Sequence, residues 1–158
     1  MLNIIPKKPI TVTTKQNMGS KVFLDANVIL DISLQRQGFV AAGVIMEAAI
    51  KATIELYTTP AVLHVAAYYT KRHFSIEKTK QFFLSLLNDV TVIDCNHAIS
   101  VLAISSSIDD IEDALQYYTA LTHELDYFIS YDKKLKTAAL PQLPVYTAAE
   151  FVAEFSAI

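Results

Sequence analysis

Short apolar runs alternate with longer stretches of helical length from residue 21 onward. Runs of three to five apolar residues are typical of strands buried in a parallel sheet. In the longer stretches, apolar and polar residues recur with the period of an α-helix. The alternation predicts strands at 22–24, 54–58, 90–93, 127–130 and 144–146, and helices at 27–33, 39–53, 61–72, after Ser75, and at 96–107, 110–124 and 147–155. Strands that alternate with helices predict an α/β fold whose mostly parallel sheet is covered on both faces.

The helix predicted at 39–53 is apolar on almost every side. Its polar residues Gly43, Glu47 and Lys51 recur every four positions, so they form one narrow stripe. The segment 61–69 also carries little charge. Apolar surfaces of this kind usually bind a partner. We therefore expect these two helices to lie at a partner site.

Residues 1–20 differ from the rest of the chain. They contain prolines, lysines and threonines with little periodicity, which indicates an extended N-terminal arm or a remnant of cloning. Met18 is also a possible second start. The remaining residues, 21–158, have a length suited to one domain.

Composition narrows the class of protein. Hydrophobic residues make up 53% of the 158 and charged residues only 18%, which excludes intrinsic disorder. The dense apolar run at 39–46 is too short for a membrane span, which needs roughly 18 residues. The chain has one cysteine, Cys95, so an internal disulfide and a cysteine-rich metal site are excluded. There is no secretory signal, which favours a cytoplasmic protein without membrane attachment.

Carboxylates follow three of the predicted strands. Asp25, Asp94 and Asp132 come at or just after strand ends, and ligands of open parallel sheets bind beyond those ends. A fourth source is the acidic run 109–113, which opens a helix. Such residues also serve as helix N-caps, and we favour that interpretation for Asp94 and Asp109.

The cap interpretation accounts less well for Asp25, Asp113 and Asp132 taken together. Carboxylates that lie close together repel one another unless they are protonated or neutralised. Oxygen ligands without a cysteine or histidine pattern favour a hard cation such as Mg²⁺ or Mn²⁺. The net charge of −3 supplies no general attraction for nucleic acid, so nucleic-acid chemistry would need cations or a local basic patch.

Three segments in order resemble the motifs of PIN domains. They are KVFLDANVILD at 21–31, DIEDALQYY at 110–118 and DYFISYD at 126–132, and 147–155 is similar to the closing helix of that family. The resemblance covers about residues 21–155. It implies a three-layer α/β/α sandwich with a carboxylate pocket at the strand ends. It also implies a metal-dependent ribonuclease of the VapC-like toxin type, with two partners, an antitoxin protein and a second copy. We therefore expect a homodimer that buries the helix at 39–53 and the segment 61–69.

The resemblance also assigns roles to individual residues. The expected ligands of Mg²⁺ or Mn²⁺ are Asp25, Asp113 and Asp132. Asp110 is a further candidate ligand and Glu112 an auxiliary one, and Asn27 is expected to orient Asp25 through a hydrogen bond. These side chains would hold the cation while RNA is hydrolysed, with Asp25, Asp113 and Asp132 as the catalytic set.

The sequence departs from the family pattern at two places. Many members carry a glutamate in the helix after the second strand, but residues 60–72 contain no carboxylate. The usual Thr-Arg-Asp reads Ser130-Tyr131-Asp132. Two alternatives to an active nuclease therefore stay open. One is an RNA-binding or interaction module of the same fold with a lapsed pocket. The other is a phosphoacceptor domain of the receiver or haloacid-dehalogenase type, which would need acidic residues that this chain lacks near Asp25.

Candidate RNA contacts are basic and aromatic. Two basic segments, 71–73 and Lys133, Lys134 and Lys136, would contact phosphates, and Tyr117, Tyr118 and Tyr131 would stack on unpaired bases. The alternative for each is structural, because lysine runs are usually solvated and paired tyrosines usually divide between core and surface.

Overall fold

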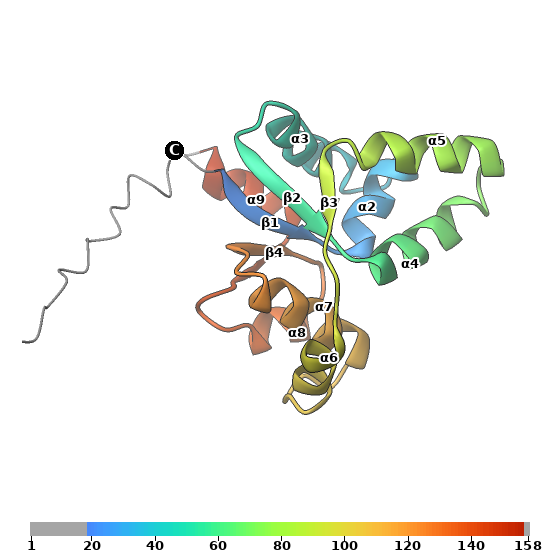
Figure 1. Cartoon of the computed structure of the whole chain (residues 1–158). Helices are drawn as coiled ribbons and strands as arrows, with labels where there is room; N and C mark the ends of the chain where they lie inside the picture. Colours follow the sequence, from blue (N-terminus) through green and yellow to red (C-terminus); the bar gives the residue numbers. More distant parts are fainter. Residues whose placement is uncertain (1–18, 157–158) are drawn as a thin grey trace, which may run out of the picture.

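A computed structural model of the chain describes residues 19–156 and places a parallel sheet at its centre (Figure 1). Within these residues the sheet has five strands in the order β3-β2-β1-β4-β5, and every neighbouring pair is parallel. The strands are β1 Ser20–Leu24, β2 Ile54–Thr58, β3 Val90–Val92, β4 Tyr127–Ile129 and β5 Val145–Tyr146. The predicted α/β class with a parallel sheet is confirmed. The predicted arm lies almost wholly outside the described residues.

Helices cover both faces of the sheet. The described helices are α2 Ala26–Ser33, α3 Phe39–Ile50, α4 Pro60–Thr70, α5 Ile76–Leu86, α6 His97–Ile104, α7 Ile111–Thr122, α8 Lys133–Ala138 and α9 Ala148–Phe155. Helices α2, α3 and α9 lie on one side with α4 and α5 beside them, and α6, α7 and α8 lie on the other (Figure 1). The expected three-layer α/β/α sandwich is therefore confirmed. Within residues 19–156, no helix combines the length and the apolar character that crossing a bilayer requires.

The strand order reverses next to β1. The chain runs outward from β1 through β2 to β3 and then returns to add β4 on the other side of β1. In open parallel sheets, the point where the order reverses opens a crevice at the carboxyl ends of the strands, because successive crossovers leave in opposite directions there. The carboxyl ends of β1 and β4 meet at this point, with Leu24 paired to Ile129.

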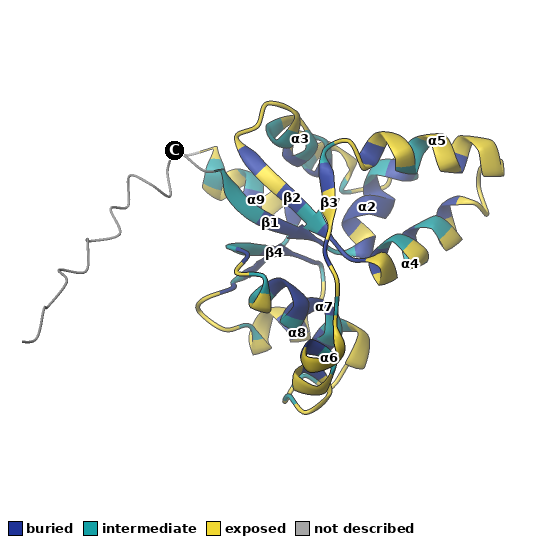
Figure 2. Cartoon of the chain, viewed as in Figure 1, coloured by how far each residue is buried: buried dark blue, intermediate teal, exposed yellow. Residues whose placement is uncertain are grey.

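The core is built around β1 and β4, whose carboxyl-terminal residues are buried, whereas β2 alternates between buried and more exposed residues (Figure 2). The rings of Phe23 and Phe128 stack with centroids 4.6 Å apart, and Tyr117 of α7 packs on Phe128 at 5.7 Å. The Tyr117 hydroxyl donates to the carbonyl oxygen of Leu143 at 2.8 Å and accepts from the backbone N–H of Leu140. Tyr117 is 1% exposed, so the prediction that it stacks on RNA bases is wrong.

Side-chain caps fix where several helices begin. Ser75 caps α5 as predicted, since its hydroxyl accepts from the N–H of Lys78. Helix α6 is capped by Asn96, and α7 by Asp110, so the predicted capping roles of Asp94 and Asp109 are wrong. A cap must sit at the last residue before the first helical turn, and both aspartates lie too early in the chain.

Helix α3 is shorter and more exposed than the sequence predicts. It ends at Ile50 rather than Thr53, because Ala52 adopts a positive φ of 56°. It packs against α2 and α9 through buried residues such as Ala42 and Ile45. Val40 nevertheless remains 76% exposed and Ile50 64% exposed. The single chain therefore covers only part of this apolar helix.

Candidate active site

Asp25 stands where β1 turns into α2. It is the N-cap of α2, and its Oδ1 accepts from the N–H of Ala26 at 2.7 Å. Its Oδ2 accepts from the hydroxyl of Ser130 at 2.8 Å. Burial raises the pKa of Asp25, and the nearby carboxylates of Asp132 and Asp110 raise it further, against the opposing effect of its hydrogen bonds.

Asp132 occupies the matching position after β4. It caps α8, and its Oδ1 accepts from the N–H of Leu135 at 2.7 Å. The N–H of Asp132 donates to the Ser130 hydroxyl at 3.2 Å. Ser130, which is 2% exposed, thus joins Asp25 to the turn that carries Asp132.

The third segment is the start of α7. Asp110 caps this helix, and its Oδ1 accepts from the N–H of Asp113 at 3.0 Å. Burial raises the pKa of Asp113 to about 7, and the carboxylates of Asp110, Asp25, Asp132 and Glu112 contribute in that order. Carboxylates from three distant segments are therefore close enough to repel one another. We call Asp25, Asp110, Asp113 and Asp132 the acidic cluster.

A cavity of about 430 Å³ opens beside the acidic cluster. Its lining is Ser107, Ile108, Asp109, Asp110, Asp113, Asp132, Lys134, Leu135 and Ala138. Lys134 is the basic residue of this lining and lies at the start of α8. In the part of the chain that the structure describes, no lysine, arginine or histidine forms an ion pair with the acidic cluster.

The donor set of the acidic cluster fits a hard cation. Asp110 and Asp132 each use Oδ1 as a cap, which leaves the other carboxylate oxygen for a ligand. Uncompensated repulsion among carboxylates is also what a divalent cation would relieve. As the side chains lie, however, no three carboxylate, histidine or cysteine groups within residues 19–156 converge closely enough to hold a metal. Binding would therefore require the carboxylates to turn inward.

Two auxiliary predictions meet different outcomes. Asn27 is exposed, and its Oδ1 accepts from Nη1 of Arg36 at 3.4 Å. The side-chain hydrogen bonds of Asp25 come instead from Ala26 and Ser130, so the structure gives Ser130 the orienting role that we predicted for Asn27. Glu112 is exposed on α7 and contributes to the raised pKa of Asp113.

Ser130 is the site residue that sequence reasoning missed. The sequence feature that could have identified Ser130 is its position at the end of a predicted buried strand, two residues before Asp132. A polar residue at such a position must find a hydrogen-bond partner when it is buried. That argument predicts a partner but does not name one across 105 residues of chain.

A neutral pair stands near the place where the family pattern has a glutamate. Thr59 caps α4 after β2, and its hydroxyl donates to Oε1 of Gln116 on α7. Both residues are buried. This pair after β2 carries no charge, in keeping with the absence of a carboxylate from 60–72.

Some of the candidate RNA contacts are bonded to other residues of the chain, and others are exposed to solvent. Nζ of Lys136 pairs with both carboxylate oxygens of Glu150 at 2.7 Å, so it is engaged within the chain. Lys133 and Lys134 are exposed beside the acidic cluster. The hydroxyl of Tyr131 donates to Oδ2 of Asp31 at 2.6 Å.

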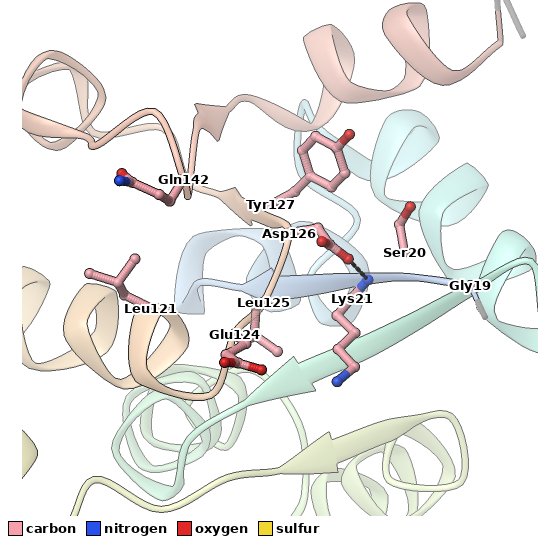
Figure 3. Close-up of a pocket in the computed structure, with 9 residues that line it drawn as sticks. All are labelled: Gly19, Ser20, Lys21, Leu121, Glu124, Leu125, Asp126, Tyr127 and Gln142. Carbon is pink, nitrogen blue, oxygen red and sulfur yellow. Dashed lines mark hydrogen bonds between the residues drawn. The ribbon is translucent and has the colours of Figure 1, made fainter. Parts of the chain in front are cut away.

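The opposite edge of the sheet holds a separate pocket of about 680 Å³ (Figure 3). Its lining is Gly19, Ser20, Lys21, Leu121, Glu124, Leu125, Asp126, Tyr127 and Gln142. Here Oδ2 of Asp126 accepts from the backbone N–H of Lys21 at 2.9 Å, and the N–H of Asp126 donates to the Lys21 carbonyl. These two bonds tie the starts of β1 and β4 together.

Known proteins with this architecture include VapC toxins. VapBC2 from Rickettsia felis, solved with a DNA fragment from its promoter, has a chain that matches with a TM-score of 0.59 and 13% identity, over 80% of this chain and 98% of that one. VapC20 from Mycobacterium tuberculosis, a toxin that cleaves the sarcin-ricin loop, matches with a TM-score of 0.60 and 11% identity, over 78% and 98%. A Pyrobaculum aerophilum protein matches with a TM-score of 0.58 and 12% identity, over 89% and 98%.

Comparison by sequence gives the family. A search of curated proteins finds no match. The family model of the PIN domain matches residues 21–134, a segment that contains all four aspartates of the acidic cluster. The chain therefore belongs to the PIN domain family.

Proposed function

We propose that this protein is a divalent-cation-dependent endoribonuclease and the toxin of a toxin–antitoxin pair. The observation that carries the proposal is the acidic cluster at the point where the strand order reverses, with the pKa of Asp113 raised to about 7. Membership of the PIN domain family supports it, and so does the likeness of the fold to VapC toxins. The choice of RNA as substrate is supported by the likeness of the fold to VapC20, which is described as cleaving the sarcin-ricin loop.

Individual residues would bind the cation, orient one of its ligands or contact the substrate. Asp25, Asp113 and Asp132 would hold Mg²⁺ or Mn²⁺, with Asp110 as a further ligand. A bound cation of this kind activates water at neutral pH and neutralises the charge that develops on the phosphate. Ser130 would keep the Asp25 carboxylate in place through the hydrogen bond at 2.8 Å. Lys134 lines the same cavity and would contact the substrate backbone.

Cleavage of a structured RNA in the presence of Mn²⁺ tests the proposal. We expect the wild-type protein to cut the RNA and Asp25→Asn to lose that activity. The matched control is Asp94→Asn, because Asp94 also follows a strand but is exposed and outside the acidic cluster. Equal cleavage by wild type and Asp25→Asn would contradict the mechanism.

An interaction module with a lapsed pocket is the second candidate. The neutral Thr59–Gln116 pair favours it, since the site has fewer carboxylates than the family pattern. Calorimetric titration with Mn²⁺ separates the two functions. Saturable binding that Asp25→Asn abolishes supports the nuclease, whereas a folded protein that binds no Mn²⁺ would support the module.

The partners would be a second copy and an antitoxin. An antitoxin is suggested by the likeness of the fold to VapBC2, which was solved bound to a DNA fragment from its promoter. On this chain α3 and α4 expose apolar side chains, among them Val40, Ile50, Tyr68 and Tyr69. Burial of such side chains would stabilise a homodimer. Light scattering should give the mass of a dimer at micromolar concentration, and a monomer would refute this part. An RNA substrate and an antitoxin would both place the protein in the cytoplasm.

A further inference from the structure

Asp31 is a charged residue inside α2. It is 3% exposed, and burial of a carboxylate is costly unless the charge is paired and hydrogen-bonded. Its Oδ2 accepts from the hydroxyl of Tyr131 at 2.6 Å, and its Oδ1 lies 3.4 Å from Nε of Arg36. A buried ion pair is weak evidence for added stability, but its contacts fix where the Arg36 guanidinium lies.

Arg36 is held at several points but remains open to solvent. Besides its ion pair with Asp31, its Nη1 donates to Oδ1 of Asn27 at 3.4 Å, and its backbone N–H donates to the Asp31 carbonyl at 3.1 Å. The Arg36 side chain is 44% exposed. A guanidinium has five N–H donors, so these contacts leave donors for a ligand.

The anchors of Arg36 belong to the two turns that carry candidate metal ligands. Asn27 follows Asp25 by two residues in the first turn of α2. Tyr131, which binds the same carboxylate as Arg36, directly precedes Asp132. The guanidinium is therefore bound directly to the first turn of α2 through Asn27, and is linked to the turn after β4 only through Asp31, which accepts from Tyr131.

Arg36 nevertheless lies outside the acidic cluster. The charges that shift the pKa of Asp25 and of Asp113 are carboxylates, whereas the charge of Arg36 acts on Tyr131, whose pKa it lowers against a larger rise caused by burial. Arg36 does not line the cavity beside the acidic cluster, but with Asp31 and Tyr131 it lines a neighbouring pocket of about 840 Å³. The guanidinium thus stands beside the acidic cluster, on the side of Tyr131. It does not compete with a cation for the aspartates.

We propose that Arg36 binds a backbone phosphate of the RNA next to the one that is cleaved. This inference rests on the proposed ribonuclease function. The acidic cluster repels RNA, so a positive group beside it would draw the strand across the crevice. The planar guanidinium binds phosphate through two parallel hydrogen bonds, and its fixed position reduces the entropy lost on binding.

The salt dependence of RNA binding tests this role directly. Binding of a fluorescent single-stranded RNA is measured in the cleavage-disabled Asp25→Asn protein between about 50 and 200 mM salt. Each phosphate contact on a single strand contributes about 0.7 to the slope of log K against log salt concentration. We expect Arg36→Gln to weaken binding several-fold and to reduce the slope by about 0.7. Lys51→Gln removes one positive charge from an exposed pair elsewhere and should leave the slope unchanged.

Two further variants test whether the position of the Arg36 guanidinium matters, independently of its charge and of the folding of the protein. A Cβ on Gly38 would lie 2.0 Å from Oδ2 of Asp31 and 2.5 Å from the Tyr131 hydroxyl oxygen, so Gly38→Ala should displace the anchor and lower affinity without removing a charge. Gly43→Ala is its control, since a Cβ there meets nothing within 4 Å. The double variant Asp31→Asn/Arg36→Gln leaves no unpaired buried carboxylate and should show the same loss of slope as Arg36→Gln.

The outcomes distinguish the two proposals. If the Asp25→Asn protein binds RNA and Arg36→Gln and the double variant both behave like Lys51→Gln, the role of Arg36 is overturned while the ribonuclease proposal stands. If neither the wild-type protein nor Asp25→Asn binds the single-stranded RNA, the role of Arg36 is overturned. The ribonuclease proposal is then decided separately by the cleavage of structured RNA in the presence of Mn²⁺.

Discussion

Hydrogen-bonded aspartates lie at both edges of the sheet, but their electrostatic surroundings differ. At the amino edge, Asp126 joins β4 to the backbone of Lys21 through two hydrogen bonds. At the carboxyl edge, Asp25 joins β1 to Ser130 through a similar bond, but the carboxylates of Asp132 and Asp110 raise its pKa. A hydrogen-bonded aspartate is therefore ordinary at either edge. The concentration of like charges is what distinguishes the carboxyl edge, where we propose the active site, from the amino edge.

The parallel fold explains why the charges gather at one edge. The carboxyl ends of the strands lead into helix N-termini, where an aspartate is favoured as a cap and by the positive end of the helix dipole. Asp25, Asp132 and Asp110 cap α2, α8 and α7. Capping thus accounts for three acidic residues, and Asp113 adds the fourth.

Replacement of one aspartate at each edge should have opposite effects on the melting temperature. The loss of cleavage on replacement of Asp113 is the largest effect on activity that we expect. We expect Asp113→Asn to lower cleavage roughly 100-fold or more, because a ligand is lost. The same change should raise the melting temperature of the metal-free protein at pH 8, because a repelled charge is removed. Asp126→Asn should lower the melting temperature and leave cleavage by the folded protein unchanged. Equal loss of activity in both variants would contradict the comparison.

The next largest effect that we expect is on the pH dependence of the melting temperature. The pKa of Asp113 is about 7 in the folded protein against 3.8 ordinarily, so the folded state binds a proton that the unfolded state has lost. This contribution to stability is fully present below about pH 4 and is lost as the pH rises through about 7. The melting temperature of the metal-free protein should fall more steeply between pH 5 and 8 than that of Asp113→Asn. Parallel curves for the two proteins would exclude the raised pKa. Mn²⁺ should raise the melting temperature more at pH 8 than at pH 5.

A smaller effect is expected at Ser130. Loss of its hydrogen bond to Asp25 in Ser130→Ala should weaken Mn²⁺ binding about 10-fold, as is typical when the partner of a metal ligand is removed. Ser33→Ala is the matched control, because Ser33 is also buried and hydrogen-bonded, but to Thr70. Calorimetry should show unchanged Mn²⁺ affinity for Ser33→Ala. The same affinity in both variants would remove Ser130 from the site.

The smallest effect on activity is expected at Tyr117. Tyr117→Phe loses the hydrogen bonds to Leu143 and Leu140, which should cost about 1–2 kcal/mol of unfolding free energy. Cleavage by the folded protein should not change, because Tyr117 belongs to the core. Chemical denaturation and the RNA assay measure the two quantities. Weaker RNA binding without loss of stability would restore the stacking role.

Much of the fold could be predicted from the sequence. Strand and helix periods differ, and β1 and β4 contain short apolar runs, so the alternation predicts the parallel sheet. Helix α8 escaped prediction because six residues, four of them polar, show no helical period. Its presence follows from the cap that Asp132 provides.

The site was predictable only in outline. The rule that ligands lie beyond the carboxyl ends of strands identifies Asp25 and Asp132. It does not identify Ser130 or the bond between Tyr131 and Asp31, because these join residues at least 100 positions apart. Pairings of this kind depend on strand order, which local sequence patterns do not determine.

The central claim is that the acidic cluster, and not the amino edge, binds a divalent cation. A crystal soaked in Mn²⁺ and examined by anomalous scattering tests it most directly. The account predicts a peak among Asp25, Asp113 and Asp132, with the carboxylates turned inward, and none beside Asp126. A fully soaked crystal with no peak at the acidic cluster, or with a peak only beside Asp126, would contradict it.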